Sequence, residues 1–458
     1  MVSSSELPTR PRRFAIIGSS GATGLGALKV CLDELQYYIR ARDIELVGFE
    51  QRGDIGGVWL ADPQPDPSKK WPESPAYDSL QTNIPHPIMF YPSHLAPPST
   101  HLYSGVQTVN GYLRSYVDRF GLRPYIQFNT ELTAATWDNS TNQWNVTTRP
   151  YETQGAETVS QFDHLLIANW HYRHPYIPKF DGFDDWASCN SRSYTHSIWY
   201  RRPDPYRDHD VLVIGGGRSG GDCATEIYTV GKKLVHAVRS PEDQDKGRHI
   251  RRGAISHFTS DGFVHFANGK SEHVDRVIFA TGYEYDCSFL TQLPVEEPRY
   301  DSDHLYNSRV HIYPLALHMF PLRAAFPPNS LAFIGLNYGV PAFTSAEVQT
   351  ALAIRQMTGA VSIDFDEELA RTLERNEKLR AEHSSAFEAF TYLDLLREKS
   401  NDTEWQQLKK SGLADEWSQG VGTGGIQEWI DLMWRVVERA KDRQESGAAL
   451  TLTPKSEE

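Results

Sequence analysis

Two segments of this sequence consist of an apolar strand, a cluster of glycines and a helix, and they constrain the fold more than any other feature. In 211-VLVIGGGRSGGDCATEI-227, Gly215, Gly217 and Gly220 have the G-x-G-x-x-G spacing of a dinucleotide-binding turn. The first glycine makes the turn, the second lets the backbone approach a pyrophosphate, and the third lets helix and strand pack closely. The helix N-terminus adds N–H groups and a positive dipole end. A parallel α/β nucleotide-binding fold is therefore predicted.

The earlier segment, 14-FAIIGSSGATGLGALK-29, has one residue too many for the same motif. Gly18, Gly21 and Gly24 are spaced G-x-x-G-x-x-G. When the two motifs are aligned on their last glycine, Gly21 becomes the glycine of close approach and Gly18 the turn glycine. Ser19 and Ser20 then replace the single residue between them. We predict that this longer loop still holds a pyrophosphate, with a serine hydroxyl or amide available to a phosphate oxygen.

The residue after the next strand indicates which dinucleotide each turn binds. The strand 44-IELVGFE-50 ends in Glu50, beyond the usual distance of about 20 residues from the turn, because a long helix over 25–42 intervenes. A carboxylate there suits an unphosphorylated ribose, as in FAD. The strand 234-LVHAVRS-240 includes Arg239, and an arginine accommodates the 2′-phosphate of NADPH. The alternative for Arg239 is an ordinary surface arginine.

The remaining segments predict that the second nucleotide domain is inserted in the first. A helix is expected over 106–120, and strands over 125–129, 144–148, 163–170 and 275–283. Pro- and charge-rich linkers are expected at 201–210 and 292–304. The predicted fold class is α/β with two Rossmann-like domains. Its divisions are residues 1–200 and 296–458 for the FAD domain, including a helical C-terminal tail, and 201–295 for the NADPH domain.

Composition excludes several other classes of protein. The 458 residues are 39% hydrophobic, enough for real cores, and the formal charge of -13 argues against a nucleic-acid partner. No run of 18 apolar residues occurs, so we expect no membrane span. The cysteines form no C-x-x-C pair, so neither a zinc site nor a disulfide framework is indicated and a cytoplasmic location is expected. These cysteines are Cys31, Cys189, Cys223 and Cys287.

The order of the motifs resembles that of the flavin-containing monooxygenase family over about residues 14 to 360. The first glycine turn is followed by 49-FEQRGDIGGVW-59, by 77-YDSLQTNIPHPIMFYP-92, by the second glycine turn and by 279-FATGY-283. In particular, the sequence resembles the short, soluble fungal- and plant-type members, which lack the C-terminal membrane helix of the animal forms. This resemblance implies the cofactors FAD and NADPH.

Site residues follow from the resemblance position by position. Asn83, in the L-x-T-N segment, is implied to lie at the reactive face of the flavin, to position oxygen and to be the catalytic residue; the alternative is a simple turn residue. The implied FAD-binding residues are Gly18, Ser19, Ser20, Gly21, Gly24, Glu50, Gly57, Trp59 and Thr82. The implied NADPH-binding residues are Gly215, Gly217, Arg218, Ser219, Gly220, Arg239, Thr281 and Gly282.

The sequence departs from the family in two places. The identifying pattern F-x-G-x-x-x-H-x-x-x-[FY]-[KR] is present only in its second half, 196-HSIWYR-201, since Asn190 and Arg192 occupy the F and G positions. His196 is given no catalytic role, because a packed linker histidine explains it equally well. The usual N-G-H-Y is 169-NWHY-172, and Trp170 in place of glycine is expected to reshape the approach to the flavin.

The implied reaction is oxygenation of a small molecule by dioxygen through a flavin hydroperoxide, at a soft nucleophile such as an amine nitrogen or a sulfur. Nitrogen of an alkaloid-like secondary metabolite is the preferred target. Two alternatives stay open. One is a Baeyer–Villiger monooxygenase, which acts on ketones and requires an arginine near the flavin. The other is a non-catalytic redox sensor that binds FAD and NADPH. A homodimer is also compatible with the sequence.

Overall fold

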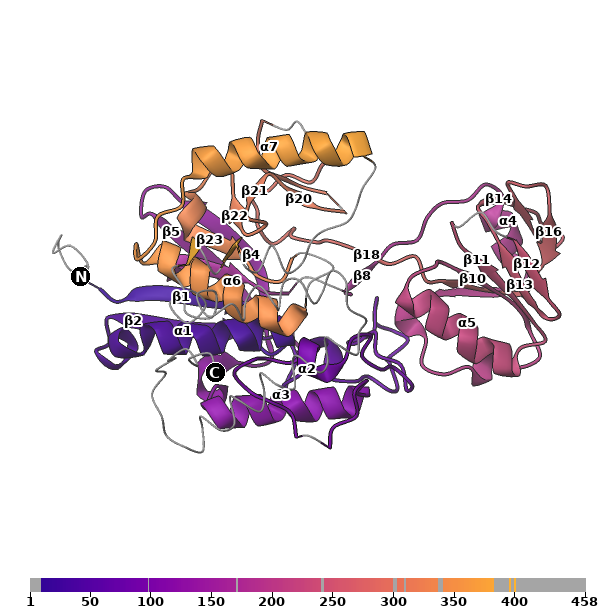
Figure 1. Ribbon diagram of the computed structural model, residues 1–458, viewed down its shortest axis with the longest axis horizontal. Coiled ribbons are helices and arrows are strands. Elements are labelled where there is room, and N and C mark those ends of the chain that lie inside the picture. Colours follow the sequence, from indigo (N-terminus) through magenta and orange to yellow (C-terminus); the bar gives the residue numbers. More distant parts are fainter. Residues whose placement is uncertain are drawn as a thin grey trace, which may run out of the picture.

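The computed structural model describes residues 10–97, 99–169, 172–239, 243–299, 303–308, 310–336, 341–382, 395–396 and 399–400, which form two bodies (Figure 1). The chain passes between the bodies through two short strands, β8 (His174–Pro175) and β18 (Tyr283–Glu284). These strands pair antiparallel to each other and lie between the bodies in Figure 1. The larger body therefore contains chain from before β8 and from after β18.

The larger body is built on a parallel sheet with the strand order β23-β7-β1-β2-β3. The alternating side chains of β1 enter two different cores: Phe14 and Ile16 face one side, while Ala15 and Ile17 face the other. An apolar strand buried on both faces is what the run of residues 14–17 predicts. The strands are β1 (Arg12–Ile17), β2 (Ile44–Phe49), β3 (Ile126–Gln127), β7 (His164–Ile167) and β23 (Leu331–Phe333).

Helices pack on one face of this sheet, and an antiparallel sheet packs on the other. The helices are α1 (Ala22–Arg40), α2 (His86–Met89), α3 (Val106–Phe120) and α6 (Ala342–Met357). A further helix, α7 (Phe365–Glu382), packs on residues 315–316. The antiparallel sheet consists of β4 (Thr130–Asp138), β5 (Gln143–Pro150) and β6 (Thr158–Phe162). Two hairpins complete the body: β19 (Tyr306–Asn307) with β20 (Ile312–Tyr313), and β21 (Leu315–Ala316) with β22 (Phe320–Pro321).

The smaller body repeats the arrangement around a sheet of order β12-β13-β11-β10-β17-β9. Helix α5 (Arg218–Val230) packs on one face. On the other face lie α4 (Phe183–Ala187) and a hairpin sheet of β14 (Ile255–Phe258), β15 (Phe263–Phe266) and β16 (Ser271–His273). The main strands are β9 (Ser193–His196), β10 (Asp210–Ile214), β11 (Lys233–Ala237), β12 (Gln244–Lys246), β13 (His249–Arg252) and β17 (Arg276–Phe279).

The predicted fold class of two Rossmann-like domains is confirmed, but the division of the chain differs from the predicted one. Strand β9 pairs with β17 in the smaller sheet, so this body begins before residue 201. The chain returns at β18, and Cys287 and Leu293 already belong to a core of the larger body, so the smaller body ends before residue 295. The predicted linkers were chosen by composition, whereas strand pairing decides where the bodies separate.

Two further observations limit the chemistry of the described residues. None of their helices combines the length and apolar character that a membrane span requires. Nor do their His, Cys, Asp and Glu side chains gather in groups of three that suit a metal ion. The four cysteines are free thiols, and those of Cys31, Cys223 and Cys287 are buried.

Candidate active site

A cavity of about 1360 Å³ opens in the larger body at the carboxyl end of its parallel sheet. This volume exceeds the roughly 300–1,000 Å³ of a pocket for a drug-sized ligand, which leaves room for a ligand of dinucleotide size. Its walls come from the first glycine turn, the chain after β2, the 60–75 loop and the start of α6. Lining residues include Gly18, Gly21, Ala22, Thr23, Glu50, Arg52, Gly57, Trp59, Lys69, Glu73, Asn83, Tyr151, Arg173, Gly335 and Phe343.

The first glycine turn places the N-terminus of α1 against this cavity. Gly18 has φ +79°, and a Cβ there would lie 2.8 Å from the Asn169 Cβ. Gly21 is the N-cap of α1, and a Cβ on Gly24 would overlap the carbonyl oxygen of Gly18. A Cβ on Gly57 would lie 2.7 Å from the Gly21 Cα. The turn is thus a backbone cradle without room for side chains, and the first N–H groups of α1 are available to an anion.

The inserted serine pair lies behind this cradle, not in it. Ser19 and Ser20 are fully buried, and the Ser20 hydroxyl donates to Glu50 Oε2 at 2.7 Å. The Ser20 N–H reaches the same oxygen at 3.3 Å, while the Arg52 N–H donates to Glu50 Oε1 at 2.9 Å. Glu50 is only 5% exposed and still lines the cavity. The Ser20 hydroxyl therefore holds the carboxylate predicted to meet the ribose. That a serine hydroxyl or amide of this loop serves a phosphate oxygen stays a prediction.

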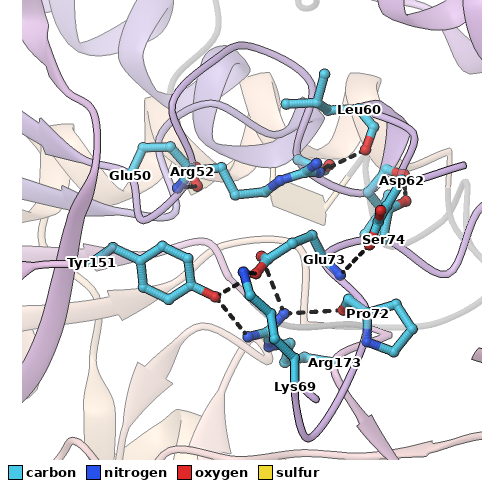
Figure 2. A network of polar contacts seen from close by, with 12 residues as sticks. Glu50, Arg52, Leu60, Asp62, Lys69, Pro72, Glu73, Ser74, Tyr151 and Arg173 are labelled. Atoms are coloured by element: carbon cyan, nitrogen blue, oxygen red, sulfur yellow. Dashed lines mark hydrogen bonds and ion pairs between the residues drawn. The ribbon is translucent and has the colours of Figure 1, made fainter. Parts of the chain in front are cut away.

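Arg52 ties the cavity wall to the Gly-Gly turn that follows β2. Its guanidinium donates from Nη1 to the carbonyl oxygens of Gly57, at 2.9 Å, and Leu60, at 2.6 Å (Figure 2). Burial lowers the pKa of Arg52, and the neighbouring Glu73 and Glu50 oppose that shift. The two carbonyl bonds fix the turn that carries the predicted flavin-contacting residues.

A second group of charges surrounds Glu73 on the 60–75 loop (Figure 2). Glu73 Oε1 accepts from Lys69 Nζ at 2.8 Å and from the Tyr151 hydroxyl at 2.7 Å. Arg173 donates to the Tyr151 hydroxyl at 3.2 Å and to the Pro72 carbonyl at 3.2 Å. Burial raises the pKa of Glu73, but the bonds from Lys69 and Tyr151 outweigh it and leave that pKa below its usual value. These contacts hold the loop against Tyr151, which follows β5, and Arg173, which precedes β8.

Asn83 lines the cavity with its side chain exposed, and no hydrogen-bond partner for that amide occurs among the described residues. Its neighbour Thr82 is buried and faces away: the Thr82 N–H donates to Ser104 O at 2.9 Å, and the Ser104 N–H donates to Thr82 Oγ1 at 3.1 Å. Thr82 therefore anchors the segment, and Asn83 presents a free amide to the cavity.

The second glycine turn has the same geometry but lies outside this cavity. Gly215 has φ +130°, Gly217 is the N-cap of α5, and a Cβ on Gly220 would overlap the carbonyl oxygen of Gly215. A Cβ on Gly217 would meet no atom within 4 Å, so the turn is open. Arg239 is exposed two residues after β11 ends.

Residues of the partial family pattern connect the bodies. His196 Nε2 donates to Gly282 O at 3.1 Å, and His196 Nδ1 accepts from the Ile198 N–H at 3.1 Å, which requires a neutral ring. Burial lowers the pKa of His196 to about 4. Arg201 donates to four carbonyl oxygens, among them that of Ser74 at 2.9 Å. The retained half of the pattern is structural in this protein. Trp170 lies outside the described residues.

The structure thus separates the predicted site residues into three groups. The residues that line the cavity are Gly18, Gly21, Glu50, Gly57, Trp59 and Asn83. Those behind its wall are Ser19, Ser20, Gly24 and Thr82. Those in the smaller body, or at its junction, are Gly215, Gly217, Arg218, Ser219, Gly220, Arg239, Thr281 and Gly282. The Thr281 hydroxyl is engaged with the Tyr176 carbonyl. Their cofactor contacts stay predictions.

Sequence reasoning missed the charged residues of the cavity wall. Arg52 could have been found from the sequence, since it follows Glu50 closely in the quoted segment 49–59. Lys69 and Glu73 lie in an irregular loop, and Tyr151 and Arg173 are distant from it in sequence. Only the fold brings these four side chains together.

Sequence comparisons place this geometry in a known context. The profile of the family described as "Flavin-binding monooxygenase-like" matches residues 11–242. "Flavin-containing monooxygenase FMO GS-OX-like 7" of Arabidopsis thaliana is 30% identical over 401 residues, covering 81% of this chain and 79% of that protein. The "Thiol-specific monooxygenase" of Saccharomyces cerevisiae is 31% identical over 287 residues, covering 61% of this chain and 62% of that protein.

Solved structures share the fold at lower identity. The S-allyl-L-cysteine S-oxygenase from Allium sativum has a TM-score of 0.72 at 24% identity, covering 95% of this chain and 99% of that one. The open form of cyclohexanone monooxygenase has a TM-score of 0.57 at 15% identity, covering 88% of this chain and 99% of that one. This protein and these two structural neighbours share the two-body architecture.

Proposed function

This chain belongs to the flavin-binding monooxygenase-like family, whose class uses FAD and NADPH, and from this premise we propose that it oxygenates a soft heteroatom of a small molecule. The stoichiometry is one substrate, one O₂, one NADPH and one proton giving the oxide, water and NADP⁺. The observation that carries the proposal is the cavity that joins the N-terminus of α1, the Glu50 carboxylate and the free amide of Asn83.

The residues present suit FAD in that cavity. Glycines leave a cradle at Gly18, Gly24 and Gly57 that any Cβ would obstruct. Above it, the N–H groups of the first turn of α1 would bind the pyrophosphate, and Glu50 would accept hydrogen bonds from ribose hydroxyls. The chemistry that FAD supplies when bound is acceptance of hydride from NADPH and activation of dioxygen. The amide of Asn83 would donate a hydrogen bond to the oxygen being transferred.

The heteroatom is nitrogen or sulfur, and two similar proteins favour sulfur. Their names describe an S-oxygenase and a thiol-specific monooxygenase. Ketone oxidation, as in the structural neighbour cyclohexanone monooxygenase, requires an arginine free to act at the flavin. The three arginines that line the cavity are all held by protein oxygens: Arg52 by carbonyls, Arg149 by Glu131, and Arg173 by Glu73, Pro72 and Tyr151. Heteroatom oxygenation is therefore the better supported reaction.

The test is turnover of the flavin-loaded protein with NADPH, ¹⁸O₂ and three substrates: a thioether, a tertiary amine and a cyclic ketone. We expect a sulfoxide or N-oxide that carries one ¹⁸O, with one NADPH consumed per product. A lactone as the main product would support the ketone alternative instead. Flavin reduction without product from any substrate would support the redox sensor.

The matched variant is Asn83→Ala. Loss of a hydrogen-bond donor that acts on the transferred oxygen costs roughly 10²-fold in product formation. NADPH oxidation should continue and release hydrogen peroxide. Unchanged product formation in this variant would contradict the role proposed for Asn83.

A further inference from the structure

Residues 77–83, here called the bridging strap, contact both bodies. Tyr77 is buried and belongs to a core formed by β10 and α5 of the smaller body, and Leu80 packs against that core. At the other end, Thr82 exchanges two hydrogen bonds with Ser104 of the larger body. The strap therefore starts on one body and ends on the other, with Asn83 as its last residue.

One side of helix α5 holds the strap through three residues spaced by four. Arg218, Asp222 and Glu226 lie at i, i+4 and i+8, which places them on the same side of a helix. Asp222 accepts a hydrogen bond from the Tyr77 hydroxyl, and Glu226 accepts one from the Ser79 hydroxyl. These contacts fix the first half of the strap to the smaller body.

The same side of α5 continues to Asn83 and to the inter-body linker. Glu226 accepts a second hydrogen bond, from the Tyr200 hydroxyl at 2.5 Å, and Arg218 Nη2 lies 3.4 Å from Asn83 O. Within the described parts of the chain, neither carboxylate forms an ion pair. Asp222 and Glu226 are thus dedicated to hydroxyl donors, and hydrogen bonds to a charged acceptor are the stronger kind.

We propose that Asp222 and Glu226 are positioning residues that set the location of Asn83 through the bridging strap. The proposal rests on the proposed oxygenase function, because it assigns to helix α5 of the smaller body a part in positioning the residue that would bind the transferred oxygen. Helix α5 begins at the second glycine turn, where the nucleotide pyrophosphate would bind. Nucleotide binding and the placement of Asn83 therefore share one rigid helix, and no new group is needed to couple them.

The experiment measures how tightly NADPH oxidation is coupled to product in the flavin-loaded protein. Tyr77→Phe and Asp222→Ala each remove the same hydrogen bond. We expect each variant to lower the ratio of product to NADPH about threefold or more and to release the balance as hydrogen peroxide. The double variant should be no worse than the more severe single one, because both lose one interaction. The KM for NADPH should change by less than about twofold.

The control is Tyr228→Phe, a tyrosine of the same helix that packs on His249 and Arg248, away from the strap. Its coupling ratio should match that of the wild type. Ser79→Ala is a milder second variant, since this exposed side chain makes its bond at the surface. It should lower the ratio in the same direction as Tyr77→Phe, with unchanged flavin content.

Hydrogen exchange of the peptide that contains residues 77–83 gives a readout independent of turnover. In the flavin-loaded wild type, NADP⁺ should slow exchange of this peptide, and in Asp222→Ala it should exchange faster with or without NADP⁺. Equal exchange in wild type and variant, or a changed KM with unchanged coupling, would overturn the proposal. If Asn83→Ala itself leaves coupling unchanged, the proposed oxygen site fails and this inference fails with it. If Asn83→Ala uncouples and Tyr77→Phe does not, only the inference fails.

Discussion

The two glycine turns of this protein differ by one inserted residue, yet both allow the same close contact between a helix and a strand. In each, a helix crosses the end of a strand so closely that a Cβ on the last glycine would overlap the carbonyl oxygen of the first: Gly24 over Gly18, and Gly220 over Gly215. In each, the middle glycine is the helix N-cap. The close crossing is thus made by the first and the last glycine, and the loop between the first and the middle glycine tolerates an extra residue.

The surroundings of the two turns differ more than their backbones do. The first, here called sealed, lines the cavity and is backed by buried side chains: Ser20 is fully buried and Glu50 is 5% exposed. The second is open, since a Cβ on Gly217 would touch nothing and Arg239 is exposed. A sealed cradle suits a cofactor that stays bound, and an open one suits a nucleotide that exchanges at every turnover.

The largest expected effect comes from adding a methyl group at the helix crossing of each turn. Overpacking of this kind costs about 1–3 kcal/mol, roughly a 5- to 150-fold loss of affinity. Gly24→Ala should lose FAD, measured as flavin content after purification. Gly220→Ala should keep its FAD and raise the KM for NADPH. Equal loss of flavin in both variants would contradict the assignment of FAD to the first turn and NADPH to the second.

Arg239→Gln tests the open turn alone. Loss of a charge-assisted bond to a 2′-phosphate costs about 1.5–3 kcal/mol, so the KM for NADPH should rise roughly 10- to 100-fold. The KM for NADH, which has no 2′-phosphate, should stay near its wild-type value. Steady-state kinetics with both nucleotides measures the two KM values. An equal change in both would contradict a contact between Arg239 and the 2′-phosphate.

Ser20→Ala tests whether the inserted residue of the sealed turn positions Glu50. Removing the hydroxyl takes away one hydrogen bond to the carboxylate, while the Ser20 and Arg52 N–H groups remain. We expect FAD affinity to fall about fivefold, for a loss of about 1 kcal/mol. Ser19→Ala is the matched control, since no hydrogen-bond partner for the Ser19 hydroxyl occurs among the described residues. Equal affinities of the two variants would refute the role of Ser20.

The smallest effect concerns pH and the junction beside the open turn. His196 is buried and neutral, with its pKa lowered to about 4 from 6.5. The unfolded chain takes up a proton below pH 6.5 and the native ring does so only below about pH 4, so stability falls as pH falls through that window. The loss is about 1 kcal/mol at pH 5.5. Between pH 7.5 and 5.5, Tm should drop less in His196→Asn than in the wild type; equal drops would contradict this.

Glycine spacing and apolar periodicity were enough to predict the elements that depend on short stretches of sequence. The helix expected at 106–120 is α3 with the same bounds, and both strand–turn–helix segments form where glycine spacing and apolar runs indicated. Strand β9 escaped prediction because its four residues, Ser193–His196, are polar and gain their structure only by pairing with β17. Boundaries chosen from linker composition were displaced for the same reason.

The site was predictable only where its residues follow a motif. Glu50 and Asn83 follow quoted motifs and line the cavity. The hydrogen bond from Ser20 to Glu50 was not foreseen, because the sequence suggested only that a serine hydroxyl or amide is available to a phosphate oxygen. The salt-bridged wall of Lys69, Glu73 and Arg173 depends on a loop and on residues distant in the chain. Such contacts exist only once the fold has formed.

The most direct test of the two-turn assignment is a crystal structure of the protein with FAD and NADP⁺ bound. The FAD pyrophosphate should lie within hydrogen-bonding distance of the N–H groups at Ala22 and Thr23, with its adenosine ribose at Glu50. The NADP⁺ pyrophosphate should lie at the start of α5, with the 2′-phosphate at Arg239. An FAD pyrophosphate remote from the Gly18–Gly24 loop would contradict the assignment, even with the fold and the second turn as described.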